Sequence, residues 1–152
     1  MQIIKLGGSV ITYKKSRKPR FKRKVMDRLA KEIRDSGQEL VIVHGAGSFG
    51  HPLASKYELH LGYKNKRQLK GIAEVQRDVK NLNLKVMNAL IDAGIKAVSV
   101  APIAFIKFEN GMLRGMDKTI FRKYLGLGLT PVTFGDVVLD ERKGICICSG
   151  DD

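Results

Sequence analysis

Apolar residues along the chain fall into short dense runs separated by longer stretches with helical periodicity. Dense runs occupy residues 2–6, 39–44, 95–101 and 129–134. Runs of this length and composition are typical of strands buried within a parallel sheet. We therefore predict a strand at each of the four, with the first, QIIKL, buried.

Apolar residues at three- and four-residue steps predict helices in the intervening segments. One helix is expected over residues 21–36, with Gly37 as its C-terminal cap. A long amphipathic helix is expected over residues 68–93, ending at Gly94. A third helix is expected over residues 117–127.

Shorter patterns complete the prediction. A short helix should end near Tyr57, and two hairpins are expected at residues 105–115 and 137–148, the first turning at Asn110 and Gly111. Because strands alternate with helices, we predict an α/β fold: a three-layer α/β/α sandwich with a mainly parallel sheet covered on both faces. Its 152 residues suit a single domain.

Positive charge is in excess, with 28 Lys and Arg against 15 acidic residues, a net charge of +13. Eight basic residues and no acid lie between positions 14 and 24: Lys14, Lys15, Arg17, Lys18, Arg20, Lys22, Arg23 and Lys24. This surplus attracts phosphates, whether free or polymeric, but it also fits a solvated face or an acidic partner domain. Nucleic acid is not the expected partner, because no recognition motif is present and the run contains no aromatic residue before Phe21.

Other features indicate where the protein works. No apolar run approaches the ~20 residues that cross a bilayer, and the first ten residues lack the pattern of a signal peptide. Cys146 and Cys148 are too few for a zinc site and badly spaced for a disulfide. We therefore expect a cytoplasmic, reduced protein that is not membrane-bound.

Two glycine loops follow two of the predicted strands, at Gly7-Gly8-Ser9 and at residues 45–50. A loop at the carboxyl end of a parallel strand points backbone N–H groups at an anion, and glycine allows close approach. Two such loops at one sheet edge suggest two phosphate groups facing each other, which suits phosphoryl transfer.

Other readings of these loops fit less well. The segment GAGSFG matches a dinucleotide-binding pattern, but that pattern requires an acidic residue about 20 residues later. The corresponding stretch, residues 64–71, is basic and contains no acidic residue. A Walker-type loop needs a following Lys-Ser or Lys-Thr, which neither loop has.

Three side chains near the loops suit phosphate binding. Lys5 is a charge inside an otherwise apolar strand, which is costly when buried unless it is paired. Lys14 begins the basic run, and His51 closes the second glycine loop, where it could instead be satisfied by backbone. His44, at the end of an apolar strand, is expected to be structural.

The motifs KLGGS (5–9), VIT with a lysine-rich loop, HGAGSFGHPLA (44–54), GD (135–136) and SGDD (149–152) together resemble the isopentenyl phosphate kinases of the amino acid kinase superfamily. KLGGS occurs across the superfamily, whereas GAGSFGH marks this branch and a few relatives such as a fosfomycin kinase. The resemblance covers the whole chain in register.

The resemblance implies roles for particular residues. Lys5, Leu6, Gly7, Gly8 and Ser9, with Gly47, would hold the transferred phosphate of ATP. The phosphate of the acceptor, isopentenyl phosphate, would be bound by Ala46, Gly50, His51 and Gly150. Lys14 would stabilise the transition state, and Asp151 would orient the active-site lysines. Mg²⁺ would accompany ATP, and the start of the long helix (Ile72, Val75, Val79) could line a pocket for the apolar tail.

Family members continue past SGDD into a half that binds adenine and ribose, so residues 1–152 correspond to the N-terminal acceptor-binding domain. We expect either a fragment or one part of a split enzyme, acting as a homodimer or with a chain that carries the nucleotide-binding half. Ile145 and Ile147 lead into the final loop, so exposed apolar surface is expected there. Three alternatives remain: a kinase of another small phosphate or phosphonate such as fosfomycin, a non-catalytic basic module that binds nucleic acid, and a non-catalytic remnant.

Overall fold

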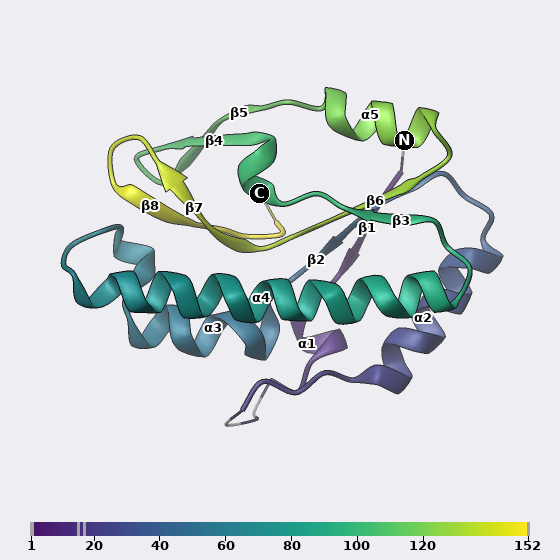
Figure 1. The fold of residues 1–152 in the computed structure, drawn as a ribbon, viewed down its shortest axis with the longest axis horizontal. Coiled ribbons are helices and arrows are strands. Elements are labelled where there is room, and N and C mark those ends of the chain that lie inside the picture. Colours follow the sequence, from purple (N-terminus) through teal and green to yellow (C-terminus); the bar gives the residue numbers. More distant parts are fainter. Residues whose placement is uncertain (1, 15, 17, 152) are drawn as a thin grey trace.

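A computed structural model describes residues 2–14, 16 and 18–151. Its first sheet contains four parallel strands in the order β1-β2-β6-β3 (Figure 1). The strands are β1 (Gln2–Leu6), β2 (Leu40–His44), β6 (Thr130–Phe134) and β3 (Ala97–Ser99). The mainly parallel sheet predicted from the four dense apolar runs is therefore confirmed.

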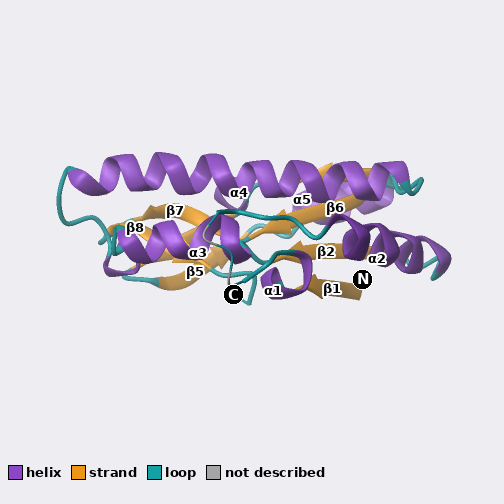
Figure 2. Ribbon diagram, turned by 90° about the horizontal axis from the view of Figure 1, so that it is seen from below, coloured by secondary structure: helices purple, strands orange, loops and turns teal. Residues whose placement is uncertain are grey.

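Most helices pack on one face of this sheet (Figure 2). They are α1 (Gly8–Ile11), α2 (Arg23–Asp35), α3 (Gly47–Lys56) and α4 (Arg67–Asp92), while α5 (Thr119–Gly126) packs on the opposite face. Gly37 and Gly94 adopt positive φ angles of 62° and 92° just after α2 and α4, as expected for helix-ending glycines. Within the described residues, no helix is long and apolar enough to cross a membrane.

The two predicted hairpins join into a second sheet of order β5-β4-β7-β8, which the sequence did not indicate. Its strands are β4 (Ile106–Glu109), β5 (Met112–Met116), β7 (Asp136–Asp140) and β8 (Gly144–Cys148). Two 3₁₀ helices, η1 (Leu59–Leu61) and η2 (Pro102–Ala104), occupy connections. The long helix α4 packs against both sheets, because Val75 and Val79 face the second sheet while Leu82, Val86 and Leu90 face the first.

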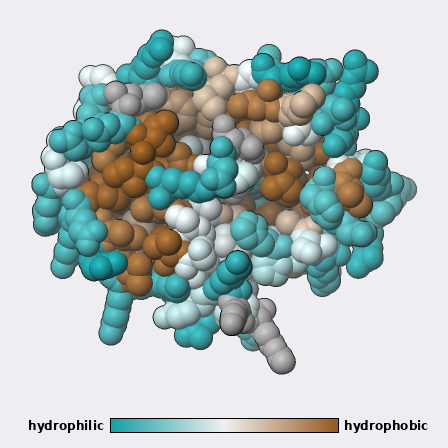
Figure 3. All heavy atoms as spheres, turned by 180° about the vertical axis from the view of Figure 1, so that it is seen from behind, coloured by the Kyte–Doolittle hydropathy of each residue, from teal (hydrophilic) through white to brown (hydrophobic). Residues whose placement is uncertain are grey.

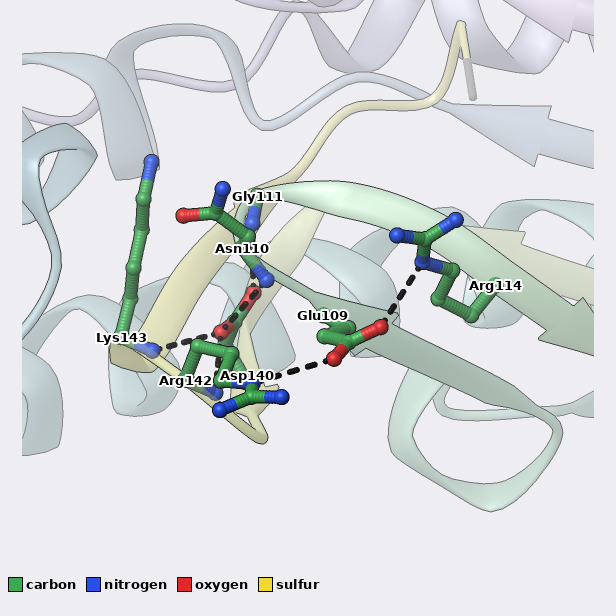
Figure 4. A network of polar contacts seen from close by, with 7 residues as sticks. All are labelled: Glu109, Asn110, Gly111, Arg114, Asp140, Arg142 and Lys143. Atoms are coloured by element: carbon green, nitrogen blue, oxygen red, sulfur yellow. Dashed lines mark hydrogen bonds and ion pairs between the residues drawn. The ribbon is translucent and has the colours of Figure 1, made fainter.

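The tips of the two hairpins are tied together by Asp140 (Figure 4). Its carboxylate accepts backbone N–H bonds from Asn110 (3.0 Å), Gly111 (2.7 Å), Arg142 (2.9 Å) and Lys143 (2.7 Å). Burial would raise the pKa of Asp140, but these four donors outweigh it and bring the pKa to about 2. The connection between β4 and β7 is thus held by a carboxylate at the turns.

Two burial expectations are wrong. The strand β1 is an edge strand whose residues are largely exposed, with Ile3 at 62% and Lys5 also exposed. An edge strand has a neighbouring strand on one side only, and the helices cover only one of its faces. Its apolar residues are therefore not necessarily buried. Conversely, Ile145 is buried and Ile147 is half-buried, because both pack beside α4 and η1. The exposed apolar surface lies elsewhere.

Candidate functional site

A cavity of about 350 Å³ opens at the carboxyl ends of the parallel strands. Both glycine loops and the last described residues of the chain line it. Its predicted members are Lys5, Gly7, Gly8, Ser9, Lys14, Ala46, Gly47, Gly50, His51, Gly150 and Asp151. Of the residues expected to bind the two phosphates, Leu6 alone does not line it. The side chain of Leu6 lies in the core, and its carbonyl accepts the Gly45 N–H at 3.0 Å.

The two glycine loops touch each other backbone to backbone. A Cβ added at Gly8 would lie 2.5 Å from the Gly47 nitrogen and 2.7 Å from its Cα, so no larger residue fits. Gly47 itself has a φ of +51°, which favours glycine. The first loop runs directly into the short helix α1, and the second begins α3. Backbone N–H groups from two helix starts therefore face the same cavity.

A buried threonine, which the sequence analysis did not single out, connects the loops. The Thr12 hydroxyl donates to the Gly8 carbonyl at 2.6 Å and accepts the Ser48 N–H at 3.1 Å. Thr12 has no exposed surface, and it follows α1 directly. Because the hydroxyl is bonded on both sides, it fixes the spacing of the loops. A single sequence gives no signal for this role beyond the threonine of VIT.

Lys5 and Asp151 form an ion pair across the cavity mouth, between the end of β1 and the last described residue. The side-chain hydrogen bond from Lys5 and its positive charge lower the pKa of Asp151. Both side chains are solvent-accessible, so the pair orients the ammonium group more than it stabilises the fold. Pairing of Lys5 with Asp151 is the arrangement that the resemblance implied.

Lys14 lies at the start of the basic loop, whose base is pinned by backbone hydrogen bonds. Tyr13 N–H donates to the Arg20 carbonyl at 3.0 Å, and the Arg20 guanidinium lies 4.7 Å from the Tyr13 ring centroid. Lys14 follows Tyr13, whose position these contacts fix, and it lines the cavity. Among the eight basic residues of the run, Lys15 and Arg17 lie outside the described residues; of the other six, only Lys14 lines the cavity.

His51 and His44 have different environments. His51, on α3, is exposed and lines the cavity. His44 is buried, stacks on Phe134 with ring centroids 5.5 Å apart, and pairs its Nε2 with Asn83 Oδ1 at 3.2 Å. Burial lowers the pKa of His44, so its neutral form is favoured. His44 also contacts the Gly45 carbonyl of the second glycine loop through its Nδ1, at 3.2 Å, and it is buried as expected of a structural histidine.

Asp136 is a further cavity residue, quoted in the GD motif but given no role from sequence. It is buried at the start of β7 and accepts one backbone N–H, from Val137 at 2.8 Å. Burial raises the pKa of Asp136 to about 6, which the Val137 hydrogen bond and Lys80 oppose only in part. A carboxyl group that titrates near neutrality at a cavity wall is a common feature of functional sites.

Part of the cavity lining is apolar. Its apolar side chains come from α3, α4, β7 and β8: Ala54, Val75, Val79, Val137 and Ile147. Two of the three helix residues expected to line a tail pocket, Val75 and Val79, do so. Ile72 instead packs in the cluster around Tyr57 and Leu59. The cavity lining therefore combines lysine side chains and backbone N–H groups with apolar side chains.

Carboxylates are sparse around the cavity. Asp136 and Asp151 line it, and oxygen ligands of this kind suit Mg²⁺. Among the described residues, no group of three or more His, Cys, Asp or Glu side chains is arranged to hold a metal ion.

Comparison with known proteins gives a consistent result. Residues 1–152 match the amino acid kinase family. The chain is 46% identical over 158 residues to the isopentenyl phosphate kinase of Methanothermobacter thermautotrophicus, covering 99% of this chain and 59% of that protein. It is 38% identical over 153 residues to the isopentenyl phosphate kinase of Thermoplasma acidophilum, covering 100% of this chain and 59% of that protein.

Solved structures agree with these similarities. One X-ray structure of an isopentenyl phosphate kinase superposes with a TM-score of 0.91 at 45% identity, covering 99% of this chain and 64% of that one. The T. acidophilum isopentenyl phosphate kinase, in a product complex, superposes with a TM-score of 0.84 at 38% identity, covering 100% of this chain and 62% of that one. The chain thus spans about three fifths of the length of these relatives.

Proposed function

The chain belongs to the amino acid kinase family, and we propose that it supplies the acceptor site and the transfer residues of a kinase that converts isopentenyl phosphate to isopentenyl diphosphate with ATP. One observation carries the proposal: both glycine loops, Lys5, Lys14 and His51 line a single cavity whose lining also includes apolar side chains. A phosphate monoester with a branched hydrocarbon tail matches both kinds of lining.

The donor end is formed by Lys5 and the first glycine loop. N–H groups from Gly8 and Ser9 would bind the transferred phosphate of ATP, assisted by Gly47 across the loop contact. Lys5, oriented by Asp151, would neutralise charge on that phosphate. Because the two loops touch, donor and acceptor phosphates would be held adjacent, and positioning of this kind supplies much of the catalysis in phosphoryl transfer.

The acceptor end is formed by the start of α3. Ala46, Gly50 and His51 would bind the phosphate of isopentenyl phosphate, with Gly150 opposite. The tail would lie against Val75, Val79 and Ile147. Lys14 would contact the oxygens of the phosphoryl group while it passes from donor to acceptor, where negative charge develops in the transition state.

Asp136 and Asp151, the two carboxylates of the cavity lining, would help hold Mg²⁺, which would supply neutralisation of the phosphate charge of ATP. The adenosine-binding half would correspond to the part of the relatives that this chain does not span. It would be supplied either by a continuation of the same chain, in a homodimer, or by a separate chain, in a heteromer. Use of ATP and a role in isoprenoid biosynthesis favour a cytoplasmic location.

The test uses a single-chain fusion of residues 1–152 to the part of the M. thermautotrophicus relative beyond the matched region. Phosphorus NMR would follow isopentenyl phosphate, ATP and Mg²⁺, and we expect isopentenyl diphosphate and ADP in equal amounts. Fosfomycin serves as the competing acceptor, because its kinase shares the GAGSFGH motif. A folded fusion that phosphorylates fosfomycin but not isopentenyl phosphate would overturn the proposed acceptor.

A further inference from the structure

The chain between α1 and α2 carries Lys14 on a loop, residues 13–20, that has few apolar anchors. Among the described residues of this Lys14 loop, none is buried. The loop lies along the lower edge of the molecule in Figure 1, and on the side opposite α4 the apolar side chains gather above that edge (Figure 3). The position of Lys14 therefore depends on contacts at the two ends of the loop.

The two ends of the Lys14 loop are held together. Thr12 and Phe21, which flank the loop, form an antiparallel bridge. Inside this bridge, the Tyr13 N–H donates to the Arg20 carbonyl at 3.0 Å. Lys14 is the next residue along the chain, so its backbone position follows from the positions of Thr12 and Tyr13.

Two hydroxyl groups connect this closed base to both glycine loops. Thr12 Oγ1 donates to the Gly8 carbonyl of the first glycine loop and accepts the Ser48 N–H of the second. The Ser48 hydroxyl in turn accepts the Arg20 N–H, at the far end of the Lys14 loop, at 3.4 Å. Both ends of the Lys14 loop are therefore tied to both glycine loops, and Thr12 makes the central contacts.

The surroundings of the Thr12 hydroxyl leave no free space. A Cβ added at Gly47 would overlap Thr12 Oγ1, and one added at Gly45 would lie 2.7 Å from the Gly8 nitrogen. Thr12 has no exposed surface and Ser48 is 5% exposed, so solvent does not replace their hydrogen bonds. A buried N–H that loses its acceptor is costly. Loss of the Thr12 hydroxyl would therefore force the two glycine loops and the Lys14 loop to shift.

We propose that Thr12 is a positioning residue of the kinase, whose hydroxyl holds Lys14 in register with the two glycine loops so that the lysine meets the phosphoryl group during transfer. The inference rests on the proposed function, because it assigns the residue that places Lys14 relative to the two phosphates. Thr12 does not line the candidate site cavity, so it acts through the backbone of the loops and not on the substrates.

A purely structural role for Thr12 is the alternative, and the two roles change different quantities. A hydroxyl that only stabilises the fold would alter the fraction of folded protein and leave turnover by the folded enzyme intact. A hydroxyl that places Lys14 would lower kcat with little change in either KM, because the lysine acts on the transition state while the bound substrates keep their other contacts.

The experiment compares variants of the fusion kinase described above. Thr12→Val replaces the hydroxyl with a methyl group of similar shape. We expect kcat to fall at least about tenfold, while the KM values for ATP and acceptor stay within about threefold. Thr12→Ser keeps the hydroxyl and should restore kcat to within about threefold of the unaltered fusion. An unchanged kcat in Thr12→Val, or a kcat that Thr12→Ser does not restore, would overturn the proposal.

Thr133 offers a matched control. It is a buried threonine on β6, 8% exposed, whose Oγ1 has no hydrogen-bond partner within the described part of the chain. It does not line the candidate site cavity. Thr133→Val makes the same chemical change as Thr12→Val and should leave kcat within about twofold of the unaltered fusion. Equal falls in the two variants would count against a specific role for Thr12 and would overturn the proposal.

Coupling between Thr12 and Lys14 is tested with Lys14→Met in two backgrounds. If Thr12→Val has already displaced the lysine, the fall in kcat caused by Lys14→Met should be at least about tenfold smaller in the Thr12→Val fusion than in the unaltered fusion. Residues that act independently would give effects that multiply. Multiplying effects would overturn the proposal, because Thr12 would then not act through Lys14.

Amide hydrogen exchange makes the test independent of kinase activity. In the 152-residue chain, Thr12→Val should speed exchange at Ser48 and Tyr13 at least about tenfold, because the first amide loses its acceptor and the second loses the support of Thr12. Exchange at Leu82 and Leu90, buried in α4, should stay unchanged and show that the fold is intact. A folded variant with unchanged exchange at Tyr13 would overturn the proposal.

Failure of the proposed acceptor leaves both readouts usable, since the rates can be measured with fosfomycin and the exchange needs no substrate. If Thr12→Val does not fold, Thr12→Cys takes its place in every comparison, because a thiol is a weak hydrogen-bond donor and acceptor. The pair Thr12→Cys and Thr12→Ser then differs in sulfur against oxygen alone, and the same outcomes support or overturn the proposal.

Discussion

The two ends of strand β7 carry the same residue type in opposite environments. Asp136, at the cavity end, is buried with one backbone N–H donor, and its pKa is raised to about 6. Asp140, at the hairpin end, is equally buried but accepts four backbone N–H bonds, and its pKa falls to about 2 (Figure 4). Desolvation acts on both carboxyl groups, and the number of donors decides the direction of the shift.

This difference separates a region built for ligand from a region built for the fold. At the hairpin end the carboxylate charge is satisfied by backbone N–H groups of the two turns. The cavity end leaves cations, N–H groups and one carboxyl group with capacity for further partners. Substitutions at the cavity end should therefore affect chemistry or relieve strain, and substitutions at the hairpin end should affect stability.

The largest effect is expected at Lys14. In the fusion kinase, Lys14→Met should lower kcat and kcat/KM together by roughly 10²–10³, or ~3–4 kcal/mol, with little change in ground-state binding. Lys18→Met is the control, because Lys18 belongs to the same basic run but does not line the cavity. Steady-state kinetics with varied acceptor measure both. Equal behaviour of the two variants would reduce Lys14 to part of the basic surface.

The next largest effect is expected at Asp136, where a substitution should raise the stability of the fold. A carboxyl group whose folded-state pKa lies above its unfolded value destabilises the fold as pH rises from about 4 to about 6. Asp136→Asn should remove this loss and raise the free energy of unfolding at pH 7 by about 3 kcal/mol, with little effect at pH 4. Urea denaturation of the 152-residue chain at both pH values provides the measurement. A variant that is less stable at pH 7 would contradict the assignment.

His51 should affect the acceptor alone. In the fusion kinase, His51→Ala should weaken acceptor binding and turnover by ~1.5–3 kcal/mol, the range for one hydrogen bond to a charged group, while ATP affinity stays nearly intact. His60→Ala is the control, because His60 is exposed and does not line the cavity. Unchanged acceptor KM and kcat would remove His51 from the site.

The smallest effect is expected at Asp140. Asp140→Asn retains one oxygen acceptor but loses the charge, so the free energy of unfolding at pH 7 should fall by ~1–2 kcal/mol. Because the pKa of Asp140 is below its ordinary value, this contribution exists above about pH 4 and disappears as pH falls toward 2. Denaturation at pH 7 and pH 3 measures the trend. A loss that is larger at low pH would contradict it.

Much of the candidate site could be predicted from the sequence because glycine loops after strands have a local physical meaning. Gly8 and Gly47 are required by a backbone contact, and their motifs alone indicated phosphate binding. Thr12 and Asp136 were missed as site residues, because their roles depend on which backbone atoms face them. Neither a buried hydroxyl bridge nor a poorly satisfied carboxylate has a sequence pattern of its own.

The strands, the helices, their order and the two glycine loops could be predicted from the sequence, since hydrophobic periodicity and glycine placement act over a few residues. Only the tertiary structure decided burial, which is a property of neighbours. Isoleucine is exposed at position 3, on an edge strand, and buried at position 42, on the neighbouring strand. The joining of two hairpins through Asp140, and the convergence of Lys5 with Asp151 from opposite ends of the chain, likewise required the fold to bring distant residues together.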